Sequence, residues 1–81
     1  MSRENKELIK DYYGALISEG MYVNEINMRR QGWITEVSNE DGIGKVKIKV
    51  VQKMGKFLDN KSSYITDFEP STNWCKALVD G

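Results

Sequence analysis

Three lysines at alternate positions, Lys45, Lys47 and Lys49, are the residues of this sequence whose spacing most clearly suggests chemistry. Side chains two residues apart in a strand point to one face, so their ammonium groups would form a stripe. Trp33 and Tyr64 could place aromatic rings beside it, as many nucleic-acid binders do. An acidic protein surface would satisfy the same lysines, and lysines on an exposed strand face also discourage edge-to-edge aggregation. The stripe therefore predicts a binding surface but leaves its ligand open.

The distribution of charge points to the same region. The formal net charge is zero, which argues against an overall attraction to nucleic acid or to an anionic membrane. Residues 29–61, however, carry eight basic against four acidic side chains, while the segments on either side are acidic. The candidate partner-binding residues are Arg29, Arg30, Trp33, Lys45, Lys47, Lys49, Lys53 and Tyr64.

Residues able to carry out catalysis are scarce. The sequence has no histidine and a single cysteine, Cys75, so the commonest general base, a cysteine-based zinc site and an internal disulfide are all excluded within one chain. Close carboxylate pairs occur at Glu40–Asp41 and at Asp67 with Glu69, where solvated acidic residues at turns and strand ends are ordinary. We therefore expect no enzyme activity, no metal and no cofactor.

The N-terminal part has the spacing of an amphipathic helix over residues 3–19. Its apolar side chains recur on one face of such a helix. They are Leu8, Ile9, Tyr12, Tyr13, Leu16 and Ile17. Ser2 is a suitable N-cap, and Gly20 offers the left-handed residue that commonly ends a helix.

The remainder of the sequence predicts strands. Residues 31–38 are rich in aromatic and β-branched types, residues 39–42 have turn chemistry, and residues 45–53 alternate strictly, with Val46, Ile48 and Val50 on the core side. Further strands are expected near residues 57–58 and 63–68. After Pro70, the spacing of Trp74, Ala77 and Leu78 predicts a short C-terminal helix. Residues 21–30 fit a short strand or one helical turn equally well.

These elements predict one compact α+β domain over residues 1–81. An N-terminal amphipathic helix would pack on an antiparallel meander of three or four strands, followed by the short C-terminal helix. Closure of the meander into a small SH3-like barrel is the alternative for the sheet. The sequence resembles no family motif closely enough to name one.

The function predicted is a small, non-catalytic protein–protein interaction module. The chain begins at a methionine and carries no catalytic set, which suits a stand-alone inhibitor or accessory protein of a phage or other mobile element acting on a larger, nucleic-acid-processing protein. One alternative is a small β-barrel that binds nucleic acid through the basic sheet face, and another is a structural subunit that self-associates. A lone cysteine, a charged N-terminus and the lack of a long apolar run favour the cytoplasm and no membrane partner.

Overall fold

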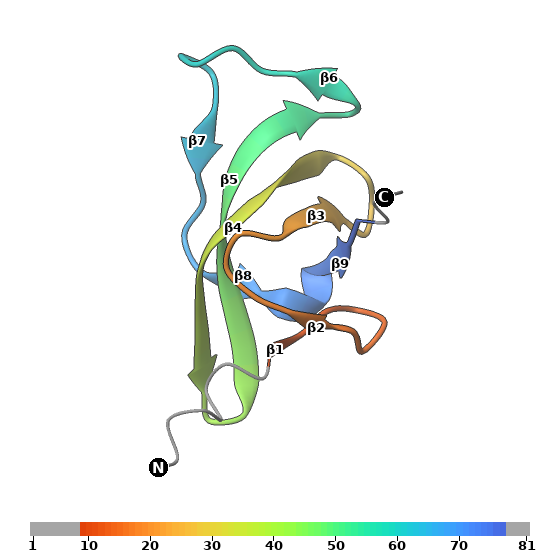
Figure 1. Cartoon of the computed structure of the whole chain (residues 1–81), viewed down its shortest axis with the longest axis vertical. Coiled ribbons are helices and arrows are strands. Elements are labelled where there is room, and N and C mark those ends of the chain that lie inside the picture. The colour runs from red at the N-terminus through yellow and green to blue at the C-terminus, as the bar shows by residue number, and fades with distance from the viewer. Residues whose placement is uncertain (1–8, 78–81) are drawn as a thin grey trace.

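A computed structural model of the chain describes residues 9–77, which form β-strands, turns and one 3₁₀ turn. The strands are β1 (Ile9–Lys10), β2 (Leu16–Ile17), β3 (Tyr22–Glu25), β4 (Arg30–Glu40), β5 (Ile43–Lys53), β6 (Lys56–Phe57), β7 (Tyr64–Ile65), β8 (Glu69–Pro70) and β9 (Trp74–Lys76). β1 and β2 form a hairpin, and the other seven form one antiparallel sheet (Figure 1). The described part of the chain is therefore all-β, and the predicted α+β class is wrong.

The β4–β5 hairpin is the frame of the molecule, and Figure 1 shows it as the two longest arrows. Its two-residue turn, Asp41–Gly42, has positive φ at both positions, 55° and 82°, as a type I′ turn requires. The side chain of Asn39 supports the turn by accepting a hydrogen bond from the amide of Gly42 at 3.0 Å. The strands predicted over residues 31–38 and 45–53, and the turn between them, are thus confirmed.

β5 organises the sheet because both of its edges are used. β4 pairs with one edge, and β8, β7 and β6 pair in succession along the other. Beyond β4 the sheet continues through β3 to β9. The two edge strands of the sheet are β6 and β9, and they do not pair with each other. The sheet is therefore not closed, and the predicted barrel alternative is wrong. The segment left open at residues 21–30 contains a short strand, β3, followed by a turn.

The predicted N-terminal helix is wrong where the chain is described, since residues 9–17 form the β1–β2 hairpin; residues 1–8, including Ser2 and Leu8, lie outside the described residues. Asp11 favours the turn, because its carboxylate accepts hydrogen bonds from the amides of Tyr13 at 2.9 Å and Ala15 at 2.8 Å. Side-chain bonds of this kind compete with helical hydrogen bonding. Gly14 adds a residue at φ +86°. Ile9 and Ile17, which would share one face of a helix, instead lie opposite each other on β1 and β2.

The predicted C-terminal helix is also wrong over the described residues. Ser71–Asn73 form a single 3₁₀ turn, and Trp74–Lys76 form β9, which pairs with β3. The far edge of β9 is capped by the first hairpin: Tyr12 donates its amide to the carbonyl of Trp74 at 2.9 Å, and Lys76 donates its amide to Asp11 at 2.7 Å. Backbone pairing on both edges outweighs the helical spacing of Trp74 and Ala77. Leu78 lies outside the described residues.

The hydrophobic core lies on the inner face of the sheet, which is the face against which the β1–β2 hairpin packs. Its buried members come from six strands and include the three alternating residues predicted from β5. They are Ile9, Ile17, Val23, Ile34, Val46, Ile48, Val50 and Trp74. The opposite, outer face carries the lysine stripe and is open to solvent.

Candidate functional site

A row of side chains crosses the outer face of the sheet over four strands, and we name it the aromatic row. Strand register places Tyr22 beside Trp33, Trp33 beside Lys49, and Lys49 beside Ile65. The rings of Tyr22 and Trp33 pack edge to face with centroids 4.8 Å apart. Trp33 nevertheless keeps 48% of its surface exposed and Ile65 keeps 57%. The row therefore presents a fixed aromatic pair, an aliphatic side chain and one ammonium group to solvent.

A β-bulge next to Trp33 sets this geometry. The register between β4 and β5 shifts between Gln31 and Gly32, so that Gly32 lies opposite Val50 with its backbone against that of Lys49. A Cβ atom at position 32 would lie 2.0 Å from the carbonyl oxygen of Lys49. Only glycine allows this approach, which leaves Trp33 in line with Lys49 on the outer face.

Two lysines of the predicted stripe are already paired with acids. Lys45 lies 3.4 Å from Glu40, and Lys47 lies 3.4 Å from Glu36. The ammonium group of Lys47 also lies 4.9 Å from the centre of the Phe68 ring. Exposed pairs of this kind add little stability, but they cancel most of the field that would attract a phosphate chain. Among the described residues, Lys49 has no acidic partner, so it is the uncompensated charge of the stripe.

Arg30, a candidate binding residue, is held by hydrogen bonds within the protein. Its guanidinium donates to both carboxylate oxygens of Glu25, at 2.8 and 2.7 Å, and to both of Glu69, at 2.9 Å each. It also lies 5.0 Å from the centre of the buried Trp74 ring. The hydrogen bonds from Arg30 hold the pKa of Glu25 below its ordinary value, and the two carboxylates raise the pKa of Arg30 further. This double fork ties β3, β4 and β8 together and leaves Arg30 little capacity for a ligand.

The remaining candidates, Arg29, Lys53 and Tyr64, gather where the β3–β4 and β5–β6 turns meet. Two hollows lie there, of about 610 and 460 Å³, and they share Asn27, Arg29 and Met54. Lys53 and Tyr64 line the smaller hollow, where the lysine ammonium lies 5.6 Å from the ring centre. We name the two together the turn cleft. The eight predicted residues therefore fall into two groups, the aromatic row with its stripe and the turn cleft, whose smaller hollow Arg30 also lines.

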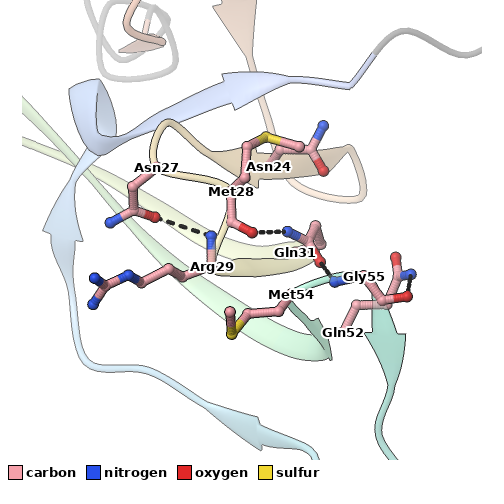
Figure 2. Close-up of a pocket in the computed structure, with 8 residues that line it drawn as sticks. All are labelled: Asn24, Asn27, Met28, Arg29, Gln31, Gln52, Met54 and Gly55. Carbon is pink, nitrogen blue, oxygen red and sulfur yellow. Dashed lines mark hydrogen bonds between the residues drawn. The ribbon is translucent and has the colours of Figure 1, made fainter.

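The sequence did not indicate the amide side chains that build the larger hollow. Figure 2 shows Gln31 bridging the two turns: it donates to the carbonyl of Met28 at 3.0 Å and accepts from the amide of Gly55 at 3.3 Å. Gln52 accepts a hydrogen bond from the hydroxyl of Tyr22, which joins this hollow to the aromatic row. A phenol is protonated and can donate at neutral pH, and burial raises the pKa of Tyr22 further from neutrality. No spacing in the sequence distinguishes these amides from ordinary surface residues.

The described residues offer few candidate nucleophiles or metal ligands. Burial, and after it the charge of Asp11, raises the pKa of the Cys75 thiol, which disfavours the reactive thiolate. Residues 9–77 contain no group of three or more histidine, cysteine or acidic side chains arranged to hold a metal ion.

Comparison with models of protein families, with curated proteins and with solved structures finds no match to this chain. Within the part of the chain that the structure describes, no helix has the length and apolar character needed to cross a membrane.

Proposed function

We propose that this chain is a non-catalytic protein-binding module whose binding surface is the outer face of the sheet, centred on Trp33. The observation that carries the proposal is the aromatic row, in which a half-exposed tryptophan packs against Tyr22 and is followed across the sheet by Lys49 and then Ile65. The other two lysines of the stripe, Lys45 and Lys47, are already paired with acids. Tryptophan, tyrosine and an isolated charge at the centre of a patch are typical of the residues that dominate protein–protein binding energy.

The row is arranged so that binding costs little conformational entropy. Trp33 packs against Tyr22, and the Tyr22 hydroxyl donates to Gln52, so the two rings are held before a partner arrives. Lys49 is exposed between Trp33 and Ile65, and its ammonium group has no ion-pair partner within residues 9–77. The partner surface that fits is apolar, with one carboxylate placed opposite Lys49.

A nucleic-acid ligand for this face is the weaker proposal. A phosphate chain needs several uncompensated cations in a line, but Lys45 and Lys47 face Glu40 and Glu36, and Arg30 is held by two glutamates. The compact outer face of the sheet suits an inhibitor or accessory protein of a phage or other mobile element.

The test is capture of a partner by immobilised protein from lysate of the cells in which the chain is expressed, after nuclease digestion. The proposal expects one stoichiometric protein that is retained by the wild type and by Tyr13→Ala, and lost with Trp33→Ala. Tyr13 is the matched control, because it is an aromatic residue 77% exposed on the β1–β2 turn, away from the row.

Lys49 then tests the chemistry of the partner with purified components. Lys49→Glu should weaken binding of the captured protein by about tenfold or more, while Lys49→Arg keeps it, because only the former removes and reverses the charge. Capture of nucleic acid alone, or equal capture by wild type and Trp33→Ala, would contradict the proposal. Concentration-dependent self-association lost with Trp33→Ala would replace it with the structural-subunit alternative.

A further inference from the structure

The turn cleft is a second surface, which adjoins the aromatic row at the Tyr22–Gln52 hydrogen bond but differs from it in chemistry. It lies on either side of Arg29, with Asn27 and Met54 contributing to both of its hollows. Volumes of about 610 and 460 Å³ fall within the range of small-molecule sites. One hollow is lined mainly by cations and an aromatic ring, and the other mainly by amides and thioethers.

The smaller hollow has an excess of positive charge. Arg29 and Lys53 form no ion pair with any described residue, and both are exposed. The carboxylate of Glu25, which also lines this hollow, is already held by Arg30. Its side chains that can still donate to a ligand are Arg29, Lys53, the amide of Asn27 and the hydroxyl of Tyr64. Several converging donors suit an oxyanion with three terminal oxygens.

The larger hollow offers a ligand the carboxamide of Asn24 and the NH₂ group of Asn27, because both groups of the Gln31 and Gln52 amides are already hydrogen-bonded. No hydrogen bond to another described residue uses the side chain of Asn24, and that of Asn27 accepts one from the amide of Arg29 while its NH₂ group stays free. Figure 2 shows Met28 and Met54 from the two turns among these amides. Both methionines are exposed, at 57% and 76%. Thioethers make favourable contacts with aromatic rings and adapt to their shape.

The backbone beneath the methionines is unusual. Met28 and Met54 adopt left-handed conformations, with φ of 64° and 53°, which residues other than glycine and asparagine rarely do. Each is fixed by its amide, Met28 donating to the carbonyl of Glu25 at 2.7 Å and Met54 to that of Arg29 at 2.8 Å. Met54 and Gly55, with φ of 53° and 82°, form the two-residue turn between β5 and β6, and they repeat the type I′ angles of Asp41–Gly42. The turn thereby fixes the position of the Met54 side chain.

We propose that the turn cleft binds a nucleotide, with its phosphate at Arg29 and Lys53 and its base in the amide-lined hollow. The carboxamide of Asn24 presents a donor and an acceptor side by side, which matches the edge of adenine. The ring would lie against the thioethers of Met28 and Met54, and the phosphate would compensate the two free cations. An acidic peptide is the weaker fit, since a carboxylate has two oxygens for the donors and brings no ring.

The test is a titration of ¹⁵N-labelled protein followed by NMR, with AMP, inorganic phosphate and N-acetylglutamate amide as separate probes. Saturable shifts with AMP at millimolar concentration or below are expected, and they should include the side-chain NH₂ signals of Asn24 and Asn27. Arg29→Gln should weaken AMP binding by about tenfold or more, because charge-assisted bonds to phosphate are lost. Lys45→Gln is the matched control, since Lys45 is paired with Glu40 on the outer face, and it should leave binding unchanged.

A 5′-phosphorylated oligoadenylate identifies the source of the nucleotide. Tighter binding of the oligonucleotide than of AMP assigns the cleft to the end of a strand, and equal binding assigns it to free nucleotides. The proposal is overturned if AMP gives no saturable shift, if inorganic phosphate or the glutamate amide binds as tightly as AMP, or if Arg29→Gln binds AMP like the wild type. None of these results bears on the aromatic row, so the two proposals fail independently.

Discussion

Replacing Arg30 by methionine should destabilise the protein by about 3 kcal/mol or more at neutral pH. The substitution keeps an unbranched side chain against Trp74 but removes four hydrogen bonds to Glu25 and Glu69. The side chains of Arg30, Glu25 and Glu69 are only 21%, 11% and 24% exposed. Removing one partner of a largely buried ion pair costs about 3–5 kcal/mol, because the remaining charges stay desolvated. Here two carboxylates would also be left facing each other.

The stability difference between the wild type and Arg30→Met should depend on pH, because Arg30 lowers the pKa of Glu25. Hydrogen bonds from Arg30 lower the pKa of Glu25 from its ordinary value of 4.5. A carboxylate whose pKa is lower in the folded state stabilises the fold above its unfolded pKa and loses that contribution as pH falls through the folded value. In Arg30→Met, burial and the neighbouring Glu69 instead favour the protonated form of Glu25. The stability difference between wild type and variant should therefore narrow as the pH drops below about 4.5.

Urea unfolding followed by tryptophan fluorescence and far-UV circular dichroism, at neutral pH and at acidic pH, measures this difference. Arg29→Met is the matched control, because Arg29 is exposed and has no ion pair among the described residues, and it should lie within about 0.5 kcal/mol of wild type. An Arg30→Met variant as stable as the control, or a difference that widens in acid, would refute the assignment of Arg30 as a structural tie.

Three further predictions concern stability and are measured by thermal and urea unfolding. Gly32→Ala should cost about 3 kcal/mol or more, because the new Cβ atom would lie 2.0 Å from the backbone oxygen of Lys49. Gly44→Ala should cost less, because its Cβ atom would meet only side-chain atoms, those of Ile9 and Ser71 at 2.9 Å. Asp11→Ala should cost about 3 kcal/mol of stability, since the Asp11 carboxylate accepts hydrogen bonds from three backbone amides. A variant as stable as the wild type would contradict the role of Asp11 in the β1–β2 turn. Trp74→Phe should be tolerated far better than Trp74→Ala, because the buried indole N–H has no hydrogen-bond partner among the described residues; similar losses for both would contradict this reading.

The sequence predicted the parts of the fold that local pattern determines. Strict alternation in residues 45–53 identified β5 and its buried face, and the turn residues before it identified the β4–β5 hairpin. It failed at residues 9–17 because apolar residues eight apart, such as Ile9 and Ile17, suit a helix face and a short hairpin alike. The buried carboxylate of Asp11 decides between them, in part through Lys76, 65 residues away.

The candidate site was predicted in composition but not in arrangement. Trp33 and Lys49 lie side by side, as a strand stripe with a nearby aromatic residue suggested. Which cations are free could not be read from the sequence, because pairing depends on register and on distant strands: Arg30 meets Glu69, 39 residues away, through the pairing of β8 with β5. The sequence did not indicate the amides of the turn cleft either, since Gln31 and Gln52 become cross-strand partners only through the β4–β5 register beyond its bulge.

Strand register also explains how a neutral chain can hold two selective surfaces. Among the described residues of the basic segment, ion pairs hold Arg30, Lys45 and Lys47 and leave five cations without one: Arg29, Lys49, Lys53, Lys56 and Lys61. Of these, Lys49 lies in the aromatic row, and Arg29 and Lys53 line one hollow of the turn cleft. An isolated cation beside apolar side chains contributes to specificity more than to long-range attraction, because a wrong partner leaves it desolvated and unpaired. Binding at the aromatic row should therefore depend weakly on salt and strongly on the loss of Trp33. Binding at the turn cleft, where Arg29 and Lys53 act on one anion, should fall more steeply as salt rises.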